Sequence, residues 1–130
     1  MNKELTQQLF DKYPKIFIQK DLPPSESLMC FGFECMDGWY WLVDHLCNSI
    51  QSHIDNNLHN KIPQLEAVQV KQKFGSLRFY YNGGNDYIRG LIAFAEYLSY
   101  NICEKCGSTK NVKRTKGWIT PLCEDCFPKE

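Results

Sequence analysis

Apolar and polar side chains alternate in two neighbouring segments within residues 66–84, and this alternation predicts a β-hairpin. The alternating apolar positions are Val68, Val70, Leu77, Phe79 and Tyr81. A period of two places alternate side chains on one face of each strand. The connection at residues 74–76 is short enough for a tight antiparallel turn, in which Gly75 supplies the positive φ that such turns need. We expect the rest of the chain to be organised around this hairpin.

The same alternation over residues 28–35 predicts a third strand. Its apolar side carries Met29, Phe31, Phe33 and Cys35. With the hairpin it is expected to form a small antiparallel sheet. The predicted fold class is therefore α+β, with a core domain over residues 1–102 in which two long helices cover the sheet. Residues 103–130 are predicted to form a separate module packed on this core.

Helical spacing of apolar residues predicts three helices. The first is short, amphipathic and covers residues 3–13. The second starts with Asp37 as its N-cap and presents one apolar stripe to the sheet. The third starts at Asn85 or Asp86, ends near Asn101 and carries a second apolar stripe of Tyr87, Phe94 and Tyr97. A helix that is apolar on two sides is buried on both or offers one to a partner, including a second copy of the chain.

Four cysteines near the C-terminus have the spacing of a structural zinc site. Cys103 and Cys106 form one CxxC pair, and Cys123 and Cys126 form another after sixteen intervening residues. Each pair places two thiolates on one turn of the chain, and two such turns complete a tetrahedron. Four thiolates leave no position for a substrate, so Zn²⁺ is expected to be structural and to fold a two-knuckle ribbon. A redox CxxC motif is the competing interpretation.

Two groups of basic and aromatic side chains are candidates for contact with an anionic ligand. The first is predicted to share the hairpin face away from the core and consists of Lys71, Lys73, Arg78 and Tyr80. The second lies in the loop between the CxxC pairs, which has no acidic residue, and includes Lys113, Arg114, Lys116 and Trp118. Cations beside aromatic rings suit nucleic acid or a nucleotide. The alternative for the first group is a solvated sheet face. For the second group it is that Trp118 packs the ribbon against the preceding helix, while the lysines balance the charge of a zinc–thiolate centre.

Composition indicates a soluble globular protein and excludes a general polycation. Of 130 residues, 43% are hydrophobic and 23% charged, and fifteen basic residues balance fifteen acidic ones. Recognition of an anion must therefore be local. No segment is long and apolar enough to span a bilayer, so we expect a cytoplasmic protein without a membrane partner. The remaining cysteines, Cys30, Cys35 and Cys47, lie in apolar contexts and are expected to be buried, with a second metal site as the alternative.

Three blocks of the sequence resemble a family of small uncharacterised proteins of tailed bacteriophages and prophages. They are GFECMDGWYWLVDHLC, VQVKQKFGSLRFYYNGG, and IAFAEYLSYNICEKCG with GWITPLCEDC. In that family the blocks are similar to a Cys-x-Asp-Gly-Trp helix start, a Lys-Phe-Gly-x-Leu-Arg-Phe-Tyr hairpin and a C-terminal zinc ribbon. The resemblance implies a phage or mobile-element origin and a place in the cytoplasm of a host bacterium. It implies no activity and no catalytic residue.

Three functions from different classes follow from these patterns. The favoured hypothesis is a zinc-stapled protein that acts by occupancy on nucleic acid or a nucleotide signal, in phage regulation or counter-defence. The second is a protein–protein interaction module, an inhibitor or adaptor of a host protein, that uses the aromatic stripe on the third helix. The third and least favoured is a small hydrolase or nuclease using Glu34, Asp37 or His45, because no histidine lies in a recognisable catalytic motif.

Overall fold

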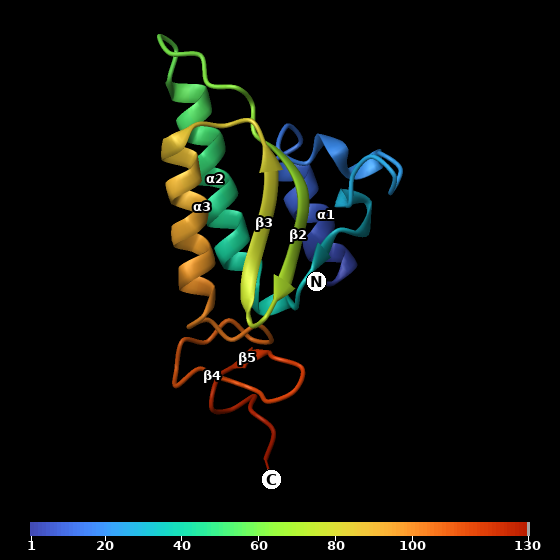
Figure 1. The fold of residues 1–130 in the computed structure, drawn as a ribbon, viewed down its shortest axis with the longest axis vertical. Helices are drawn as coiled ribbons and strands as arrows, with labels where there is room; N and C mark the ends of the chain where they lie inside the picture. The colour runs from blue at the N-terminus through green and yellow to red at the C-terminus, as the bar shows by residue number, and fades with distance from the viewer. Residues whose placement is uncertain (130) are drawn as a thin grey trace.

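The structure, a computed structural model, describes residues 1–129 and has an α+β fold built on a small sheet (Figure 1). One three-stranded sheet has the order β1-β2-β3, and β4 and β5 pair separately near the C-terminus. The elements are, in chain order, α1 (Lys3–Lys12), η1 (Ile18–Asp21), η2 (Met29–Phe31), β1 (Phe33–Glu34), η3 (Asp37–Trp39), α2 (Tyr40–Asn56), β2 (Glu66–Lys73), β3 (Ser76–Asn82), α3 (Asp86–Ser99), β4 (Lys113–Arg114) and β5 (Pro121–Leu122).

The predicted hairpin is confirmed as the antiparallel pair of β2 and β3. Lys73 lies opposite Ser76, so the turn consists of only Phe74 and Gly75, and Ser76 already belongs to β3. Both turn residues have positive φ, 54° at Phe74 and 81° at Gly75. Two positive φ values define the type I′ turn, whose twist matches that of the flanking strands. The hairpin is therefore a rigid arm that ends in an exposed phenylalanine.

The prediction of a strand over residues 28–35 is wrong in length and direction. Residues Met29–Phe31 form a 3-10 turn, and only Phe33 and Glu34 pair with the sheet. Gly32 breaks the alternation, because its φ of 68° redirects the chain. The two-residue strand runs parallel to β2, since α2 lies between them and carries the chain back to the same end of the sheet. The sheet is thus mixed rather than antiparallel.

The helices match the predicted hydrophobic stripes, with one correction at a cap. The buried side of α2 carries Leu42, Val43, Leu46, Cys47 and Ile50, as the sequence pattern indicates. Asp37 does not cap α2, because its carboxylate accepts hydrogen bonds from the backbone and side chain of Asn2, at 2.8 and 3.1 Å. Of the two residues predicted as the start of α3, Asn85 is the cap, because its side chain accepts from the N–H of Ile88. In the described residues, no helix is long and apolar enough to cross a membrane.

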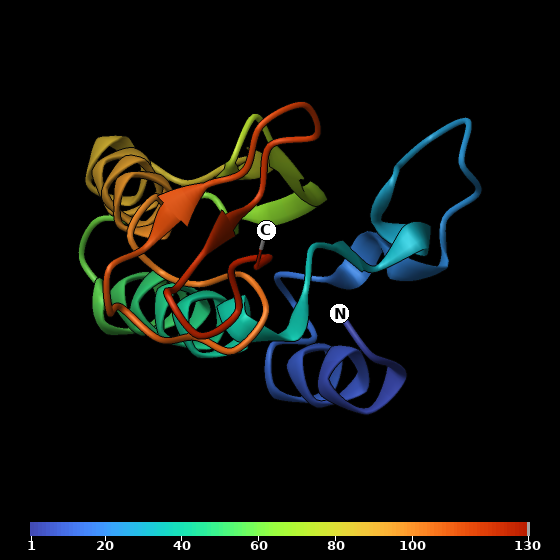
Figure 2. The ribbon, with the colours of Figure 1, turned by 90° about the horizontal axis from the view of Figure 1, so that it is seen from below.

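The C-terminal segment lies below the hairpin turn and has its own small apolar cluster (Figure 1). Viewed from below, the loop between β4 and β5 reaches across to the hairpin (Figure 2). The contact between this segment and the core is close at Gly38, where a Cβ would lie 2.3 Å from the carbonyl oxygen of Cys103. The N–H of Gly38 donates to the carbonyl of Glu104 at 2.7 Å. Backbone-to-backbone contact of this kind fixes the segment against the core.

Candidate metal centre and ligand cleft

Four cysteine sulfurs converge at the base of the C-terminal segment. The Sγ atoms of Cys103, Cys106, Cys123 and Cys126 all lie within 4.8 Å of one another. Those of Cys106 and Cys123 are 3.6 Å apart. A metal ion with metal–sulfur distances of about 2.3 Å in a tetrahedron requires sulfur–sulfur distances of about 3.8 Å. The four side chains are therefore arranged so that they can hold one metal ion.

The backbone around Cys103 favours its charged form. Burial of the sulfur opposes ionisation, but N–H groups of Cys123, Cys106 and Lys105 donate hydrogen bonds to it and lower its pKa from 9.0 to about 7. The thiolate is the form that binds metals. The surroundings thus prepare Cys103 for metal binding, whereas burial is the main cause that raises the pKa of Cys126 to about 12, and the pKa of Cys106 is also raised.

Glu104, next to the first metal-site cysteine, connects the C-terminal segment to both the core and the hairpin. Its side chain is only 3% exposed, and its carboxylate accepts from the N–H of Met36 at 2.9 Å and from the side-chain amide of Gln72 at 3.2 Å. Gln72 also donates to the carbonyl of Ile119 at 2.7 Å and accepts from the N–H of Gly75 at 3.2 Å. The hairpin turn, the β4–β5 loop and the cysteine cluster are therefore parts of one hydrogen-bonded unit.

A cleft of about 320 Å³ opens between the hairpin turn and the β4–β5 loop. The residues that line it are Lys71, Gln72, Lys73, Phe74, Gly117, Trp118 and Ile119. No acidic residue is among them. The rings of Phe74 and Trp118 are 67% and 87% exposed, and the Lys73 ammonium lies 5.5 Å from the centre of the Phe74 ring. The cleft thus combines two cations with two exposed aromatic rings.

The cleft joins members of both residue groups that the sequence pattern singled out. Lys71 and Lys73 come from the hairpin group, and Trp118 comes from the loop group. The sequence pattern does not reveal Phe74 as part of the same surface, because it belongs to a turn. The signal that could have identified it is the rarity of a bulky residue at the first position of a type I′ turn.

Two other members of the hairpin group, Arg78 and Tyr80, lie beside the cleft without lining it. The register places Arg78 directly opposite Lys71 and Tyr80 opposite Gln69. The Nε of Arg78 is buried and has no hydrogen-bond partner in the described part of the chain. Glu34 of β1 lies beside Lys71 in the register, so the hairpin face also carries a carboxylate that the sequence-based hypothesis left out.

The basic residues of the loop group make separate contacts and do not line the cleft. Arg114 stacks on the ring of Tyr100 at 4.3 Å and donates to its carbonyl at 3.3 Å, so this side chain helps to attach the loop to the end of α3. Lys113 lines a separate cavity with Asn111, Glu124 and Phe127. Lys116 is exposed. Trp118 is the member of this group that lines the cleft.

The residues considered for hydrolysis take part in separate contacts. Glu34 accepts from Gln69 at 3.1 Å, and Asp37 is bound by Asn2. The Nδ1 of His45 lies 2.8 Å from the carbonyl oxygen of Trp41, and the two rings stack at 3.9 Å. Within residues 1–129 no hydrogen bond joins any two of Glu34, Asp37 and His45.

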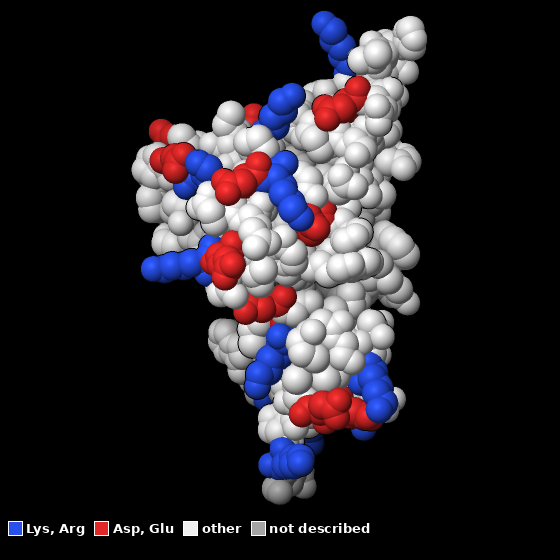
Figure 3. Space-filling view, turned by 180° about the vertical axis from the view of Figure 1, so that it is seen from behind, with Lys and Arg blue, Asp and Glu red and all other residues white. Residues whose placement is uncertain are grey.

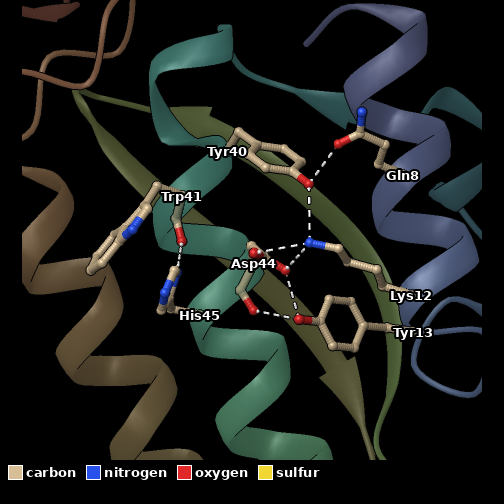
Figure 4. A network of polar contacts seen from close by, with 7 residues as sticks. All are labelled: Gln8, Lys12, Tyr13, Tyr40, Trp41, Asp44 and His45. Atoms are coloured by element: carbon tan, nitrogen blue, oxygen red, sulfur yellow. Dashed lines mark hydrogen bonds and ion pairs between the residues drawn. The ribbon is translucent and has the colours of Figure 1, made fainter.

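Asp44, the neighbour of His45, serves a network between α1 and α2 (Figure 4). Its carboxylate accepts from the hydroxyl of Tyr13 at 2.6 Å and from Lys12 at 3.3 Å. Burial, and then this hydrogen bond, raise the pKa of Tyr13, so its phenol stays protonated and donates. Lys12 also contacts the hydroxyl of Tyr40, which in turn donates to Gln8. The network therefore stabilises helix packing and leaves Asp44 unavailable as an orienting partner for His45.

Of the three cysteines outside the cluster, two are buried and one is exposed. Cys35 and Cys47 are buried, as predicted, and burial raises the pKa of both thiols, that of Cys35 to about 12. The prediction is wrong for Cys30, which is exposed. The reason is the 3-10 turn at Met29–Phe31, in which Met29 takes the buried position and its neighbour faces outward.

Comparison with known proteins found no matching family model, no matching curated protein and no matching solved structure.

Proposed function

We propose that this chain is a zinc-stapled binding protein that holds nucleotide units in the cleft between the hairpin turn and the β4–β5 loop. The observation that carries the proposal is the presence in one cleft of Lys71 and Lys73 with the exposed rings of Phe74 and Trp118. Ammonium groups contact phosphate, and exposed aromatic rings stack on bases with little dependence on sequence. The ligand is a single strand or a free nucleotide, both of which offer a phosphate beside an accessible base.

The position of Arg78 supports a ligand that extends from the cleft along the hairpin. A guanidinium group can donate two hydrogen bonds to one phosphate. Arg78 lies opposite Lys71, which lines the cleft, so one phosphate group on this face is within reach of both cations. Tyr80 adds a further exposed ring on the same face. The four hairpin residues predicted from the sequence thus form one continuous path in this proposal.

Zinc is the metal that suits the cysteine cluster best. Four thiolates in a tetrahedron select zinc or an iron–sulfur centre, and the two CxxC turns flanking the short β4–β5 pair are typical of a zinc ribbon. With four cysteine ligands, zinc would have no free coordination position for water or substrate, so it would not be catalytic. Its role is to hold the loop that carries Trp118 against the hairpin. Elemental analysis is expected to find one zinc per chain and no iron.

We infer that the protein acts by occupancy. The candidate catalytic residues take part in separate structural contacts, and the cleft contains no carboxylate or histidine. If the resemblance to phage proteins reflects its origin, binding a host nucleic acid or nucleotide signal would serve regulation or counter-defence in the bacterial cytoplasm.

Binding of labelled oligonucleotides and nucleotides, followed by fluorescence anisotropy, tests the proposal. The probes are single-stranded DNA and RNA, duplex DNA, and free nucleotides at about 50 and 200 mM salt. We expect single strands or nucleotides to bind more tightly than duplex, and higher salt to weaken binding. Trp118→Ala should abolish most of the affinity, because base stacking contributes about 1–3 kcal/mol per base. Trp41→Ala, which removes another exposed tryptophan remote from the cleft, is the matched control.

The result that would contradict the proposal is equally specific. If no phosphate-bearing probe binds at low salt, or if Trp118→Ala and Trp41→Ala bind equally well, the cleft is not a nucleotide site.

A further inference from the structure

The outer side of α3 carries exposed aromatic residues that the proposed ligand cleft does not use. Tyr87, Phe94 and Tyr97 are 59–64% exposed, whereas Ile88, Ile92 and Ala95 on the opposite side are buried. A shallow apolar groove between α3 and α2 continues this surface to Trp41. Figure 3 shows the α2 side of this region from behind, and the right flank in that view is a broad area without Lys, Arg, Asp or Glu side chains. An uncharged aromatic surface of this kind is typical of a contact surface.

The order of large and small residues along this side of α3 is symmetric. Tyr87, Gly90, Phe94 and Tyr97 follow one another at spacings of three, four and three residues, centred on position 92. Gly90 is exposed, and a Cβ at this position would meet no atom within 4 Å, so the helix surface has a notch there. When two copies of the helix lie antiparallel about position 92, each Phe94 faces the notch at Gly90 of the other copy. Each Tyr87 then faces a Tyr97.

Charged residues of α3 lie outside this stripe. Arg89 and Glu96 are seven residues apart and so share one side of α3. That side faces β3, because a Glu96 oxygen accepts from the N–H of Phe79 at 2.9 Å. The stripe itself carries no charge, so alignment of two copies about position 92 brings no like charges together.

We propose that two copies of the chain associate through α3 in an antiparallel, two-fold symmetric dimer. A two-fold interface uses the same patch on both copies and has to be self-complementary in shape and charge. The palindromic order of residues meets the condition of shape, and the absence of charged residues from the stripe meets that of charge, because no like charges are brought together. The symmetry of the stripe about position 92 favours a second copy of the chain over a different protein as the partner.

The area that two copies would bury indicates how stable the dimer is. An aromatic side chain can bury about 150–250 Å². Tyr87, Phe94, Tyr97 and the adjoining Trp41 are each exposed by about three fifths, so these four rings would bury roughly 1,000 Å² over the two copies. That area lies at the lower end of specific interfaces, which begin near about 1,000 Å². The dimer is therefore weak and its population depends on protein concentration.

Sedimentation velocity of the metal-loaded full chain at about 1–200 µM tests the dimer. The wild type should shift from monomer toward dimer over this range. Phe94→Asp should remain monomeric, whereas Phe31→Asp, which changes an equally exposed phenylalanine elsewhere, should behave as the wild type.

Gly90→Leu separates a contact role from a folding role. Leucine is a better helix former than glycine and meets free space in the single chain, so the melting temperature of the monomer should rise. The same side chain fills the notch and should abolish the dimer. A wild type that stays monomeric throughout, or a dimer that survives both Gly90→Leu and Phe94→Asp, would overturn the proposal. Because the cleft lies elsewhere, these variants should bind oligonucleotide as the wild-type monomer does.

Discussion

Phe74 adopts a backbone conformation that its side chain disfavours. Its φ of 54° lies in the left-handed region, where bulky residues are rare and which costs of the order of 1 kcal/mol or more. Asparagine is the usual residue at this position of a type I′ turn. The ring is also 67% exposed, so it gains little from burial. The proposed function explains both features, because the ring stacks on a base only when it is held at the tip of the hairpin.

Phe74→Asn should therefore improve stability and impair binding. We expect the free energy of unfolding to rise by up to about 1 kcal/mol, as the strain is removed. Affinity for a single strand should fall by about 5- to 150-fold, because one stacking ring is lost. Denaturant unfolding and anisotropy measure the two effects. A variant that is less stable but binds normally would show that Phe74 has a packing role.

Lys73 is predicted to contribute to affinity and not to folding. Its ammonium contacts no carboxylate among the described residues, so Lys73→Ala should change stability by about 0.5 kcal/mol or less. A lost charge-assisted contact should weaken binding by about 1.5–3 kcal/mol and reduce the salt slope by about 0.7 for a single strand. Lys15→Ala provides the control for a lysine outside the cleft. Equal effects of the two variants would argue against phosphate contact at Lys73.

The roles of some residues could be predicted from the sequence, and those of others could not. The four metal-site cysteines were predictable, because each CxxC pair is a local pattern and the cluster requires only that the two pairs meet. Cys30 was not, since its exposure depends on a 3-10 turn that the alternating pattern concealed. Glu34 was considered only for catalysis, because its position beside Lys71 follows from pairing between strands distant in sequence.

At the level of elements, the hairpin and helices were predictable and the first strand was not. Regular periodicity over eight or more residues specifies β2, α2 and α3. The pairing of β1 depends on only two residues, so periodicity is too weak a signal for its length or direction. Its parallel direction could have been predicted from the strand–helix–strand order, because a helical crossover returns the chain to the same end of the sheet.

Gln72 holds two elements together and supplies the most informative test at this level. Its amide contacts Glu104, Ile119 and Gly75. Gln72→Ala leaves buried acceptors without a donor, so we expect a loss of about 1–3 kcal/mol in stability and weaker oligonucleotide binding. Gln69→Ala removes a hydrogen bond to Glu34 at the surface and should have a small effect on both. Similar behaviour of the two variants would show that the hairpin and loop do not depend on Gln72.

For the whole molecule, the sequence predicted the α+β class but not the meeting of its two basic regions. The hairpin group and the loop group were separate candidates, because nothing in a linear pattern shows that residues 47 positions apart, Gln72 and Ile119, are in contact. The cleft arises from that contact. Long-range packing, which depends on the complete fold, therefore decides where the candidate site lies.

Removal of the metal should dismantle the cleft while leaving the helices in place. The cysteine cluster that could hold the metal lies within the C-terminal segment, whereas α1, α2 and α3 contribute to the main apolar core. A strong chelator under reducing conditions should therefore abolish oligonucleotide binding with little loss of helical circular dichroism, and added zinc should restore binding. Cys106→Ser should reproduce the loss. Full binding by metal-free protein would separate the cleft from the metal centre.

Photo-cross-linking of a single strand containing a photoreactive base, followed by mass spectrometry of the peptides, tests the central claim most directly. A base in the cleft lies against the exposed rings of Phe74 and Trp118, so the cross-linked peptides should contain residues 71–74 or 117–119. Competition with unlabelled strand should remove these cross-links. Cross-links confined to the outer side of α3, or to no single region, would contradict the account of this cleft as the nucleotide site.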